Sequence, residues 1–402
     1  MLCNFFASNK LQSMYRLTLS YRHSKKYSDG YSRRIVAGPK AFPLRLPDPS
    51  WVELMIPNSP AWLKRSMYIF FRVGFSQIFA LYDIARLFFF FIKIKPCIIH
   101  INNGGYPGAI SCRAAAIAAK LSGIDDIVMV VNNSAVPYTS IWRWLDLPVD
   151  CAVKKSVKKF VTGSNAAAEQ LIAVLGLSED RVQSLNNGVM PRESTAGSPK
   201  TKLRLGLDSY GGFVYGIVAV MEARKGHFIL FKAIEILQRD GVINVGNFRL
   251  LIEGDGPLQG ELKAYVQKNN LENYVFFVGK ENNIFDFMKV LDCVVLPSIA
   301  DEDFPNVVIE SMYLGKIVVA SKLAGIPEQI INDVTGLLVD PGDPYDLARA
   351  LALTLSDPAH MKILAAAAQE RFKSKFTADI AVDRYLKLYE NLSEEVEYSI
   401  GS

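Results

Sequence analysis

From Pro96 onward, short runs rich in β-branched residues alternate with longer segments of helical pattern. This alternation predicts parallel strands joined by crossover helices, because a tight turn cannot join parallel neighbours. At 402 residues the chain is long enough for two domains, each with its own core. We therefore expect an α/β protein with two Rossmann-like, doubly wound domains. In such sheets the ligand crevice lies outside the carboxyl ends of the strands, here between the domains.

The individual elements follow from the same pattern. The predicted strands are 97–101, 127–131, 159–162, 182–185, 214–220, 248–253, 275–277, 293–296, 317–320 and 336–339. The predicted helices are 109–121, 166–175 (capped by Ser164), 225–239, 259–269, 284–290, 327–331, 344–355 (capped by Asp343) and 378–392.

A segment rich in Pro, Ser, Thr and Gly, residues 191–202, is the best candidate for a linker. We therefore expect one domain over 1–192 and a second over 193–375. Residues 376–402 are expected to contain a separate amphipathic helix.

Charge divides the chain unequally. Residues 1–200 carry 25 Lys and Arg against 12 Asp and Glu, and the remainder carries 20 against 28. A basic first half favours an anionic partner, such as phospholipid or a lipid diphosphate, although a solvated surface explains it equally well. No zinc-finger or RNA-binding signature is present, so we expect no nucleic-acid partner. An aromatic and basic segment, 62–95, is a candidate for contact with an anionic membrane.

The five cysteines have no CxxC spacing, and the four histidines have no metal-ligand spacing. We expect a reducing, cytoplasmic location, with a peripheral place on the inner face of the membrane as the alternative, and we expect no disulfide framework and no metal site. The apolar run 87–99 contains two lysines and a proline and is too short to cross a bilayer.

The segment 301–310 carries two glutamates eight positions apart. Pro305 suits the first turn of a helix, where its missing N–H costs nothing. The N–H groups of Asn306 and Val307 would then point out of a helix N-terminus, where an anion binds. Glu302 precedes this helix and Glu310 lies more than one turn inside it. The layout fits a diphosphate flanked by two hydroxyl-rich groups, as in a nucleotide-sugar.

Several further segments, in order, match a known family: 224–227, 252–258, 277–279, 296–298, 324–328 and 336–339. With Glu302 and Glu310 they make residues 214–352 resemble the donor-binding half of the retaining glycosyltransferases of family 4. The resemblance implies the GT-B fold of two Rossmann-like domains, with an acceptor-binding domain over 1–192 and a nucleotide-sugar-binding domain over 193–375. It also implies that residues 376–402 form a helix that crosses back to the first domain. The N-terminal half matches loosely, mainly over 98–117 and 161–189.

The resemblance also implies residue roles. Lys225 pairs with the donor diphosphate, Glu302 faces the sugar near its anomeric carbon, and Glu310 holds the ribose. Further donor-binding residues are expected at Arg224, Gly254, Gly279, Lys280, Phe304, Asn306 and Val307. Acceptor or cleft residues are expected at His100, Asn103, Gly104, Gly105 and Asn132. No metal or other cofactor is expected.

The chain departs from the family pattern at several positions. Met1 to Phe6 reads like the middle of the first helix, so the first strand is expected to be missing. Val220 stands where relatives carry an arginine, and Asn132 follows a strand that often ends in histidine. Asp303 replaces a common glycine beside the phosphate site, where a carboxylate is unfavourable unless it turns to solvent.

The resulting hypothesis is a retaining glycosyltransferase that moves a hexose or N-acetylhexosamine from a UDP- or GDP-sugar. The acceptor is a glycan, on a polyprenyl diphosphate or other lipid, in bacterial envelope polysaccharide synthesis. The alternatives are a GT-B nucleotide-sugar epimerase and a truncated, non-catalytic nucleotide-sugar-binding protein. Conversion of a UDP-sugar without an acceptor distinguishes the epimerase, and failure to bind nucleotide favours a scaffold role.

Overall fold

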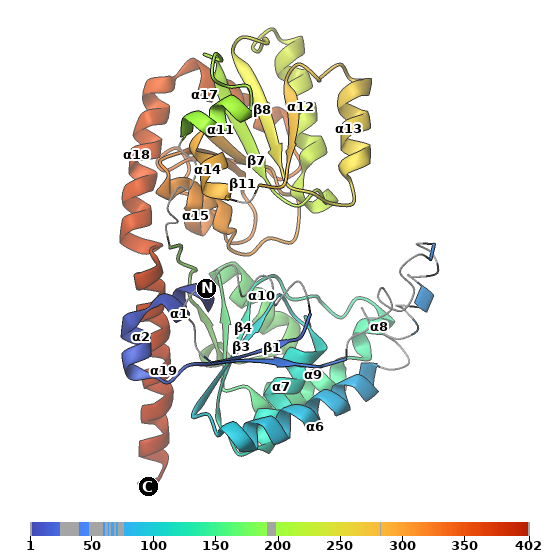
Figure 1. The fold of residues 1–402 in the computed structure, drawn as a ribbon, viewed down its shortest axis with the longest axis vertical. Coiled ribbons are helices and arrows are strands. Elements are labelled where there is room, and N and C mark those ends of the chain that lie inside the picture. Colours follow the sequence, from blue (N-terminus) through green and yellow to red (C-terminus); the bar gives the residue numbers. More distant parts are fainter. Residues whose placement is uncertain are drawn as a thin grey trace. The chain divides into compact units, whose positions relative to one another are not determined.

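The computed structural model of the chain describes residues 2–24, 40–47, 59–60, 63, 66–67, 70, 76–190, 198–281 and 283–400. It divides into two compact units (Figure 1). Unit 1 comprises Met1–Asn186 with Ala381–Ser402, and unit 2 comprises Asn187–Ile380. The domain boundaries predicted at 192 and 375 fall within a few residues of these limits. Most of the predicted linker, 191–197, lies outside the described residues, as does part of the aromatic segment 62–95.

Unit 1 is built on a parallel sheet in the order β3 (Ile98–Asn103), β4 (Asp126–Val131), β5 (Lys159–Thr162) and β6 (Val182–Ser184). β1 (Thr18–Arg22) and β2 (Lys40–Leu44) form a separate parallel pair. Among the described strands, β3 pairs with β4 alone. The first residues of the chain are helical, as predicted, in α1 (Leu2–Ala7).

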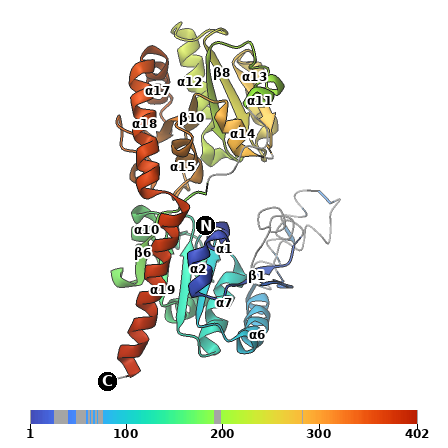
Figure 2. The ribbon, with the colours of Figure 1, turned by 60° about the vertical axis from the view of Figure 1, so that its left-hand side comes forward.

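The helices of unit 1 cover both faces of this sheet (Figures 1 and 2). Besides α1 they are α2 (Asn9–Met14), α6 (Ser76–Ile94), α7 (Ile110–Leu121), α8 (Ile141–Trp144), α9 (Leu147–Ser156), α10 (Asn165–Leu175) and the 3-10 turn η1 (Glu179–Arg181). α6 packs on α7 through Leu87 and Phe91, within the core that contains Ile127 and Met129 of β4. The opposite side chains of β4, Val128 and Val130, face another cluster.

That second cluster is closed by the C-terminal helix α19 (Ala378–Ile400). Val382, Tyr385 and Leu386 of α19 pack with Val128 and Val130. Because residues from Ala381 onward belong to unit 1, the predicted return of the tail helix to the first domain is confirmed.

Unit 2 contains a six-stranded parallel sheet, in the order β12-β11-β10-β7-β8-β9. The strands are β7 (Phe213–Val218), β8 (Phe248–Glu253), β9 (Val275–Gly279), β10 (Cys293–Leu296), β11 (Ile317–Ser321) and β12 (Leu337–Val339). β7 and β10 are neighbours at the centre although they are far apart in sequence, which requires a crossover. Their nearly continuous apolar sequences are typical of parallel strands buried on both faces.

The remaining elements of unit 2 are helical. They are α11 (Ser198–Arg204), η2 (Ala223–Lys225), α12 (His227–Arg239), α13 (Gln259–Lys268), α14 (Ile284–Lys289), α15 (Asn306–Tyr313), α16 (Ile326–Gln329), α17 (Pro344–Ser356) and α18 (Pro358–Lys375). The predicted caps are present: Ser164 Oγ accepts from the N–H of Ala167, and Asp343 Oδ1 accepts from that of Tyr345.

The predicted elements are therefore found with shifts of a few residues at their ends. Two differences matter. α12 begins at His227, and Lys225 lies in the preceding 3-10 turn because Gly226 is left-handed, with φ +70°. α18 was not predicted. Among the described residues, no helix is long and apolar enough to cross a membrane.

Candidate functional site

The loops that follow β7, β8 and β10 come together at the carboxyl edge of the sheet in unit 2. Two glycines allow this close approach. A Cβ on Gly226 would lie 1.8 Å from the carbonyl oxygen of Pro297, and one on Gly254 would lie 2.1 Å from that of Ala219. Both residues have positive φ, which only glycine adopts without strain. The segment Gly254–Pro257 therefore packs the loop after β8 closely on the loop after β7.

Lys225 and Glu302 meet at this edge. Lys225 Nζ forms an ion pair with Glu302 Oε1, and Ser298 Oγ donates a hydrogen bond to the same oxygen at 2.7 Å. The side chains of Lys225 and Glu302 are only 12% and 7% exposed. Neither is therefore the solvated surface residue that each would be in isolation. A buried pair of this kind is costly to desolvate and makes a charged site rather than a stabilising contact.

Arg224 supports the loop that carries Glu302. Its Nη1 donates to the carbonyl of Asp301 at 3.0 Å, and its Nε donates to Glu222 Oε2 at 2.8 Å. Asp301 has a positive φ of 52°, a strained backbone conformation for a residue other than glycine. The guanidinium is 4.0 Å from Glu302 Oε1, so two cations lie beside one carboxylate.

α15 presents its N-terminus beside this pair. Pro305 is the N-cap rather than the first helical residue, and Asn306 and Val307 occupy the first two helical positions. Amides at these positions have no acceptor within their own helix. Gln329 fixes the helix start by donating to the Pro305 carbonyl at 3.1 Å. Glu310 lies one turn inside α15 and is half-buried.

Two neighbours of Glu302 differ from expectation. Phe304 is buried and stacks edge-on against Phe376, with ring centroids 5.6 Å apart. The Phe304 side chain belongs to the core, so only the backbone of this residue remains as a candidate contact for the sugar donor. Asp303 was expected to turn to solvent, but it is 4% exposed. Its carbonyl accepts from the N–H of Gly325 at 3.0 Å, which holds the loop inward.

The loop after β9 forms the other border of this edge. Gly279 has a φ of +76°, and its carbonyl accepts from the N–H of Gly254 at 3.0 Å. Lys280 is exposed. The N–H of Glu281 donates to Glu253 Oε1 at 2.9 Å, while burial raises the pKa of Glu253. These hydrogen bonds join the loop after β9 to the loop after β8 at the carboxyl edge of the sheet.

Four of the five residues predicted at the acceptor side, Asn103, Gly104, Gly105 and Asn132, lie at the carboxyl ends of β3 and β4 in unit 1. Asn132 Nδ2 donates to Asn102 Oδ1 at 2.9 Å and to the Asn103 carbonyl at 2.8 Å. Asn103 is fully buried, and its Oδ1 accepts from the N–H of Ala109 at 3.1 Å. These amides hold the loop in shape, so the side chain of Asn103 is committed to the protein itself.

The glycine that this loop requires is one that the sequence reasoning missed. Gly108 has a φ of +60°, and a Cβ there would lie 2.0 Å from Asn103 Oδ1. A Cβ on Gly104 or Gly105 would have no contact shorter than 3.5 Å, and neither residue has a left-handed φ. Their small size leaves open space at the loop rather than serving close packing.

His100 is a packing residue in this structure. Its ring lies among Phe5, Tyr385 and Tyr389, and its Nδ1 is 2.7 Å from the Tyr389 hydroxyl. Burial lowers the pKa of His100 to about 4. The structure therefore favours the core interpretation of this histidine over the acceptor contact.

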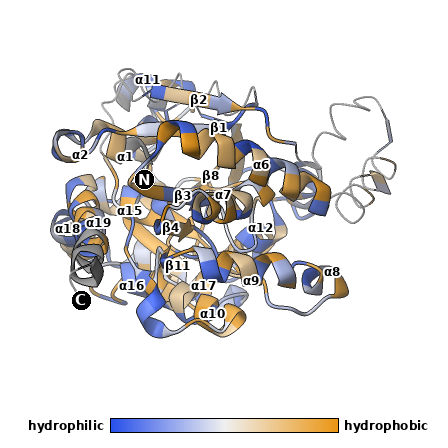
Figure 3. Ribbon diagram, turned by 90° about the horizontal axis from the view of Figure 1, so that it is seen from below, coloured by the Kyte–Doolittle hydropathy of each residue, from blue (hydrophilic) through white to orange (hydrophobic). Residues whose placement is uncertain are grey.

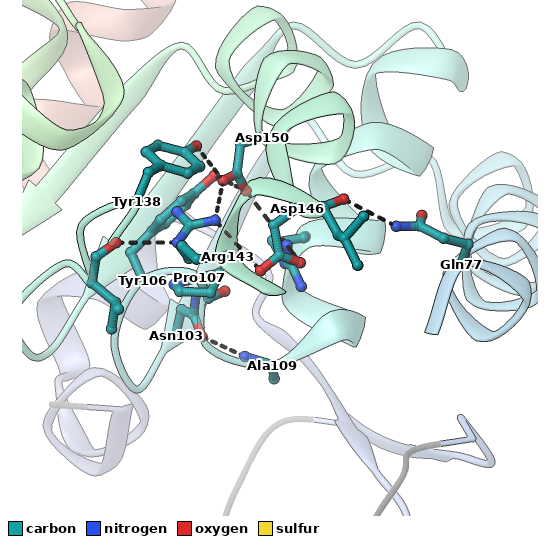
Figure 4. Close-up of polar contacts among 12 residues, drawn as sticks. Gln77, Asn103, Tyr106, Pro107, Ala109, Tyr138, Arg143, Asp146 and Asp150 are labelled. Carbon is teal, nitrogen blue, oxygen red and sulfur yellow. Dashed lines mark hydrogen bonds and ion pairs between the residues drawn. The ribbon is translucent and has the colours of Figure 1, made fainter. Parts of the chain in front are cut away.

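A buried polar cluster in unit 1 was also not predicted (Figure 4). Asp150, fully buried, accepts from the hydroxyls of Tyr106 and Tyr138 at 3.0 and 2.5 Å. It also pairs with Arg113 and Arg143 at 3.4 and 2.5 Å. The Arg143 guanidinium lies 4.2 Å from the Tyr138 ring centroid. Burial, with the hydrogen bond to Asp150, raises the pKa of Tyr138 to about 12. The five residues come from separate segments, so no local motif indicates them.

No group of three or more His, Cys, Asp or Glu side chains suited to a metal ion occurs among the described residues. Four cysteines with described side chains are free thiols: Cys97, Cys112, Cys151 and Cys293.

Comparison with known proteins agrees with this geometry. Residues 209–371 match the family described as Glycosyl transferases group 1. The chain is 27% identical over 291 residues to the 2-deoxystreptamine glucosyltransferase of Streptomyces kanamyceticus, covering 69% of this chain and 74% of that protein. It is 24% identical over 283 residues to the UDP-Gal:alpha-D-GlcNAc-diphosphoundecaprenol alpha-1,3-galactosyltransferase of Escherichia coli, covering 68% and 71% of the two chains.

Among solved structures, Anabaena HepE in complex with UDP superimposes with a TM-score of 0.73 at 19% identity. The match covers 97% of this chain and 95% of HepE, and shows a shared fold. Two Rossmann-like parallel sheets and a returning C-terminal helix give this chain the GT-B fold, and its residues 209–371, which include Lys225 and Glu302, match the group 1 glycosyltransferases.

Proposed function

We propose that this enzyme is a retaining glycosyltransferase that takes a hexose or N-acetylhexosamine from a UDP- or GDP-sugar. Its acceptor is a lipid-linked glycan of a bacterial envelope polysaccharide. The observation that carries the proposal is the convergence of Lys225, Glu302 and the N-terminus of α15 at one sheet edge. Cation, carboxylate and helix amides are the groups that a sugar diphosphate needs.

The electrostatics of the edge support a diphosphate. Lys225 Nζ is already positioned by Glu302, and the α15 amides provide a second positive region. An incoming diphosphate would compete with Glu302 for the ammonium group and free the carboxylate to turn toward the sugar. Lys225 and the amides would then stabilise the negative charge that grows on the departing nucleoside diphosphate.

In the proposed reaction, one bond to the anomeric carbon of the sugar replaces another. The bond between the anomeric carbon and the diphosphate oxygen breaks, and the acceptor oxygen bonds to the same face of that carbon. The acceptor proton passes to the departing diphosphate oxygen. Glu302 favours the positive charge that develops on the sugar ring. We propose no resident metal, since Lys225, Arg224 and the helix amides can supply the positive charge.

The names of relatives support the substrate classes. HepE was solved with UDP, and the Escherichia coli relative takes its name from a UDP-sugar donor and a diphosphoundecaprenol acceptor. Glu310, half-buried one turn inside α15, is proposed to bind the ribose hydroxyls. The backbone at Gly279 and Lys280 is proposed to border the base.

A donor screen tests the proposal. Calorimetry with UDP, GDP and their hexose and N-acetylhexosamine conjugates should give one nucleotide with micromolar affinity. Mass spectrometry with a polyprenyl-diphosphate-linked sugar should then detect transfer that persists in EDTA. Absence of binding by every nucleotide would refute the donor site. Conversion of the donor without acceptor would instead identify an epimerase.

A further inference from the structure

The outer face of α6 is apolar although its inner face already packs in the core of unit 1. Leu87 and Phe91 of the inner face are buried, whereas Ile78, Leu81 and Phe89 are 56%, 67% and 70% exposed. Tyr82 and Ile92 lie on the same stripe, at helical spacing, and are exposed as well. A helix with this pattern has a second apolar face that no described residue covers.

A second group of exposed apolar side chains adjoins this stripe. Ile141, Trp142, Trp144 and Leu145, in and just after α8, are each more than half exposed. Gln77 at the start of α6 donates to the carbonyl of Leu145 at 3.4 Å, which joins the two groups. Figure 3 shows α6 predominantly in hydrophobic colours. We call the combined surface the α6/α8 face.

The exposure of α8 is built into the fold. Arg143, between the two tryptophans, is 5% exposed and is held by Asp150 and by the Val136 carbonyl at 3.1 Å (Figure 4). With Arg143 turned inward, Trp142 and Trp144 are directed outward. The buried cluster around Asp150 therefore keeps Trp142 and Trp144 exposed on the surface.

The exposed charges on α6 are of one sign. The exposed charged side chains on α6 are Arg86 and Lys93, and Lys95 follows the helix end. The single acidic residue of α6, Asp83, is fully buried, and Asp146 beside α8 is paired with Arg113 at 2.8 Å. Trp and Tyr with a cationic rim are the composition that suits the interface of an anionic bilayer.

We propose that the α6/α8 face docks unit 1 on an anionic lipid bilayer. This rests on the proposed function, because a lipid-linked acceptor must be met at a membrane. The chain reaches α8 directly from Asn132 at the carboxyl end of β4. Docking through this face therefore holds the loop proposed to border the acceptor near the surface where that acceptor resides.

Vesicle flotation with the full chain tests the proposal. Phosphatidylglycerol–phosphatidylethanolamine vesicles should bind the protein, and pure phosphatidylcholine vesicles should bind it at least about tenfold less. The double variant L81S/F89S should lower the affinity at least about tenfold, through loss of apolar burial. R86Q/K93Q should lower it about fivefold for each cation removed, because one basic side chain near an anionic surface contributes about 1 kcal/mol.

A matched variant lies on α18 of unit 2. Lys362 is exposed and Ile363 is 66% exposed, so K362Q/I363S changes the same residue types outside the proposed face. It should bind vesicles like the wild type. Equal binding of all variants, or equal binding to neutral and anionic vesicles, would overturn the proposal. So would a switch from dimer to monomer in L81S/F89S, since the face would then bind a second copy.

Brominated lipids locate the contact. Trp142 and Trp144 are two of the four tryptophans of the chain, the others being Trp51 and Trp62. Quenching by brominated lipid should fall strongly in W142F/W144F. Unchanged quenching would assign the contact to Trp51 or Trp62 and overturn the role of α8.

Nucleotide calorimetry separates this inference from the proposed function. L81S/F89S should bind the donor nucleotide like the wild type and should lose transfer only to acceptors embedded in vesicles. Vesicle binding without nucleotide binding would refute the proposed function alone. Nucleotide binding without vesicle binding would refute the membrane face alone.

Discussion

The carboxyl ends of the two sheets differ in what their polar groups bind. In unit 2, Lys225 and Glu302 form an ion pair between the loops at the carboxyl edge of the sheet, beside the N-terminus of α15. In unit 1, Asn103 and Asn132 form hydrogen bonds within the loop that follows β3. The charged groups of unit 1 are buried and gather around Asp150. We propose that the first arrangement exchanges partners when a donor diphosphate binds, whereas the second holds the shape of its loop.

In the proposed function this difference corresponds to two kinds of substrate. A donor diphosphate carries the same charges whatever the sugar, so fixed charges suit it. The glycan of the proposed lipid-linked acceptor varies in shape, so a loop with open space at Gly104 and Gly105 suits it. Four predictions test this contrast between the charged site in unit 2 and the hydrogen-bonded loop in unit 1.

The largest expected effect is on unit 1. Replacing Asp150 by Ala leaves two arginines and two tyrosine hydroxyls without their shared acceptor. We expect a loss of about 3–5 kcal/mol in the free energy of unfolding of unit 1. Urea unfolding followed by tryptophan fluorescence measures it, because all four tryptophans lie in the range of unit 1.

Asp125→Ala is the matched control, since Asp125 makes an exposed ion pair with Lys120 in the same unit. It should cost less than about 1 kcal/mol. Nucleotide binding by unit 2 should survive in both variants. Equal stability of the two variants would contradict the structural role assigned to the cluster.

The next effect is on catalysis in unit 2. Glu302→Gln keeps the size of the side chain and an oxygen for Ser298 but removes the negative charge. Transfer should fall about 10²–10³-fold, comparable to the removal of one preorganised charge-stabilising group, while donor affinity changes only a few-fold. Steady-state kinetics with calorimetry separate the two quantities. Glu261→Gln, on the exposed face of α13, should leave both unchanged, and full activity of Glu302→Gln would refute the assignment.

A third effect depends on pH. Burial lowers the pKa of His100 in unit 1 and of His227 in unit 2 to about 4, below the ordinary 6.5. Neutral histidine is therefore favoured in the folded state. Stability is fully present above pH 6.5 and is lost as the pH falls toward 4, by up to about 1.4 kcal/mol per pH unit for each histidine.

Urea midpoints at pH 7.0, 6.0 and 5.0 measure this slope. His227→Gln should reduce the acid sensitivity of unit 2 and leave that of unit 1, while His100→Gln should do the reverse. Tryptophan fluorescence follows unit 1, and retention of nucleotide binding follows unit 2. A slope unchanged by both substitutions would contradict the burial of these rings.

The smallest effect sharpens the role of Asn132. If Asn132 only holds the loop, Asn132→Ala should cost about 1 kcal/mol of stability through its two lost hydrogen bonds. The KM for the acceptor should then rise a few-fold with kcat nearly unchanged. Asn133→Ala serves as the neighbouring control. A loss of transfer above tenfold with unchanged stability would instead make Asn132 a direct acceptor ligand.

Much of the fold was predictable because parallel strands and crossover helices leave periodic patterns in the sequence. β5, β8 and β10 were placed at their observed bounds, and Ser164 and Asp343 at their caps. The ends of other elements shifted by a few residues where tertiary contacts intervene. Gly226 is one example, since its approach to Pro297 moves the start of α12 past Lys225.

The candidate site in unit 2 was also predictable only in part. The two glutamates and the family resemblance of several segments in order were enough to predict a donor site, because these motifs are short and local in sequence. Phe304 and Asp303 could not be assigned in this way. Whether a side chain in a loop turns inward depends on neighbours such as Phe376 and Gly325, which are distant in sequence.

The sequence by itself determined the fold class, the resemblance to glycosyltransferases and the charged residues of the proposed donor site, because periodicity and motif spacing are local. Only the tertiary structure decided that Glu302 is buried against Lys225 and that Asp150 gathers two arginines and two tyrosines. It also decided that the tryptophans of α8 remain outside. These outcomes depend on which distant segments come together, and burial sets the strength of every charge among them.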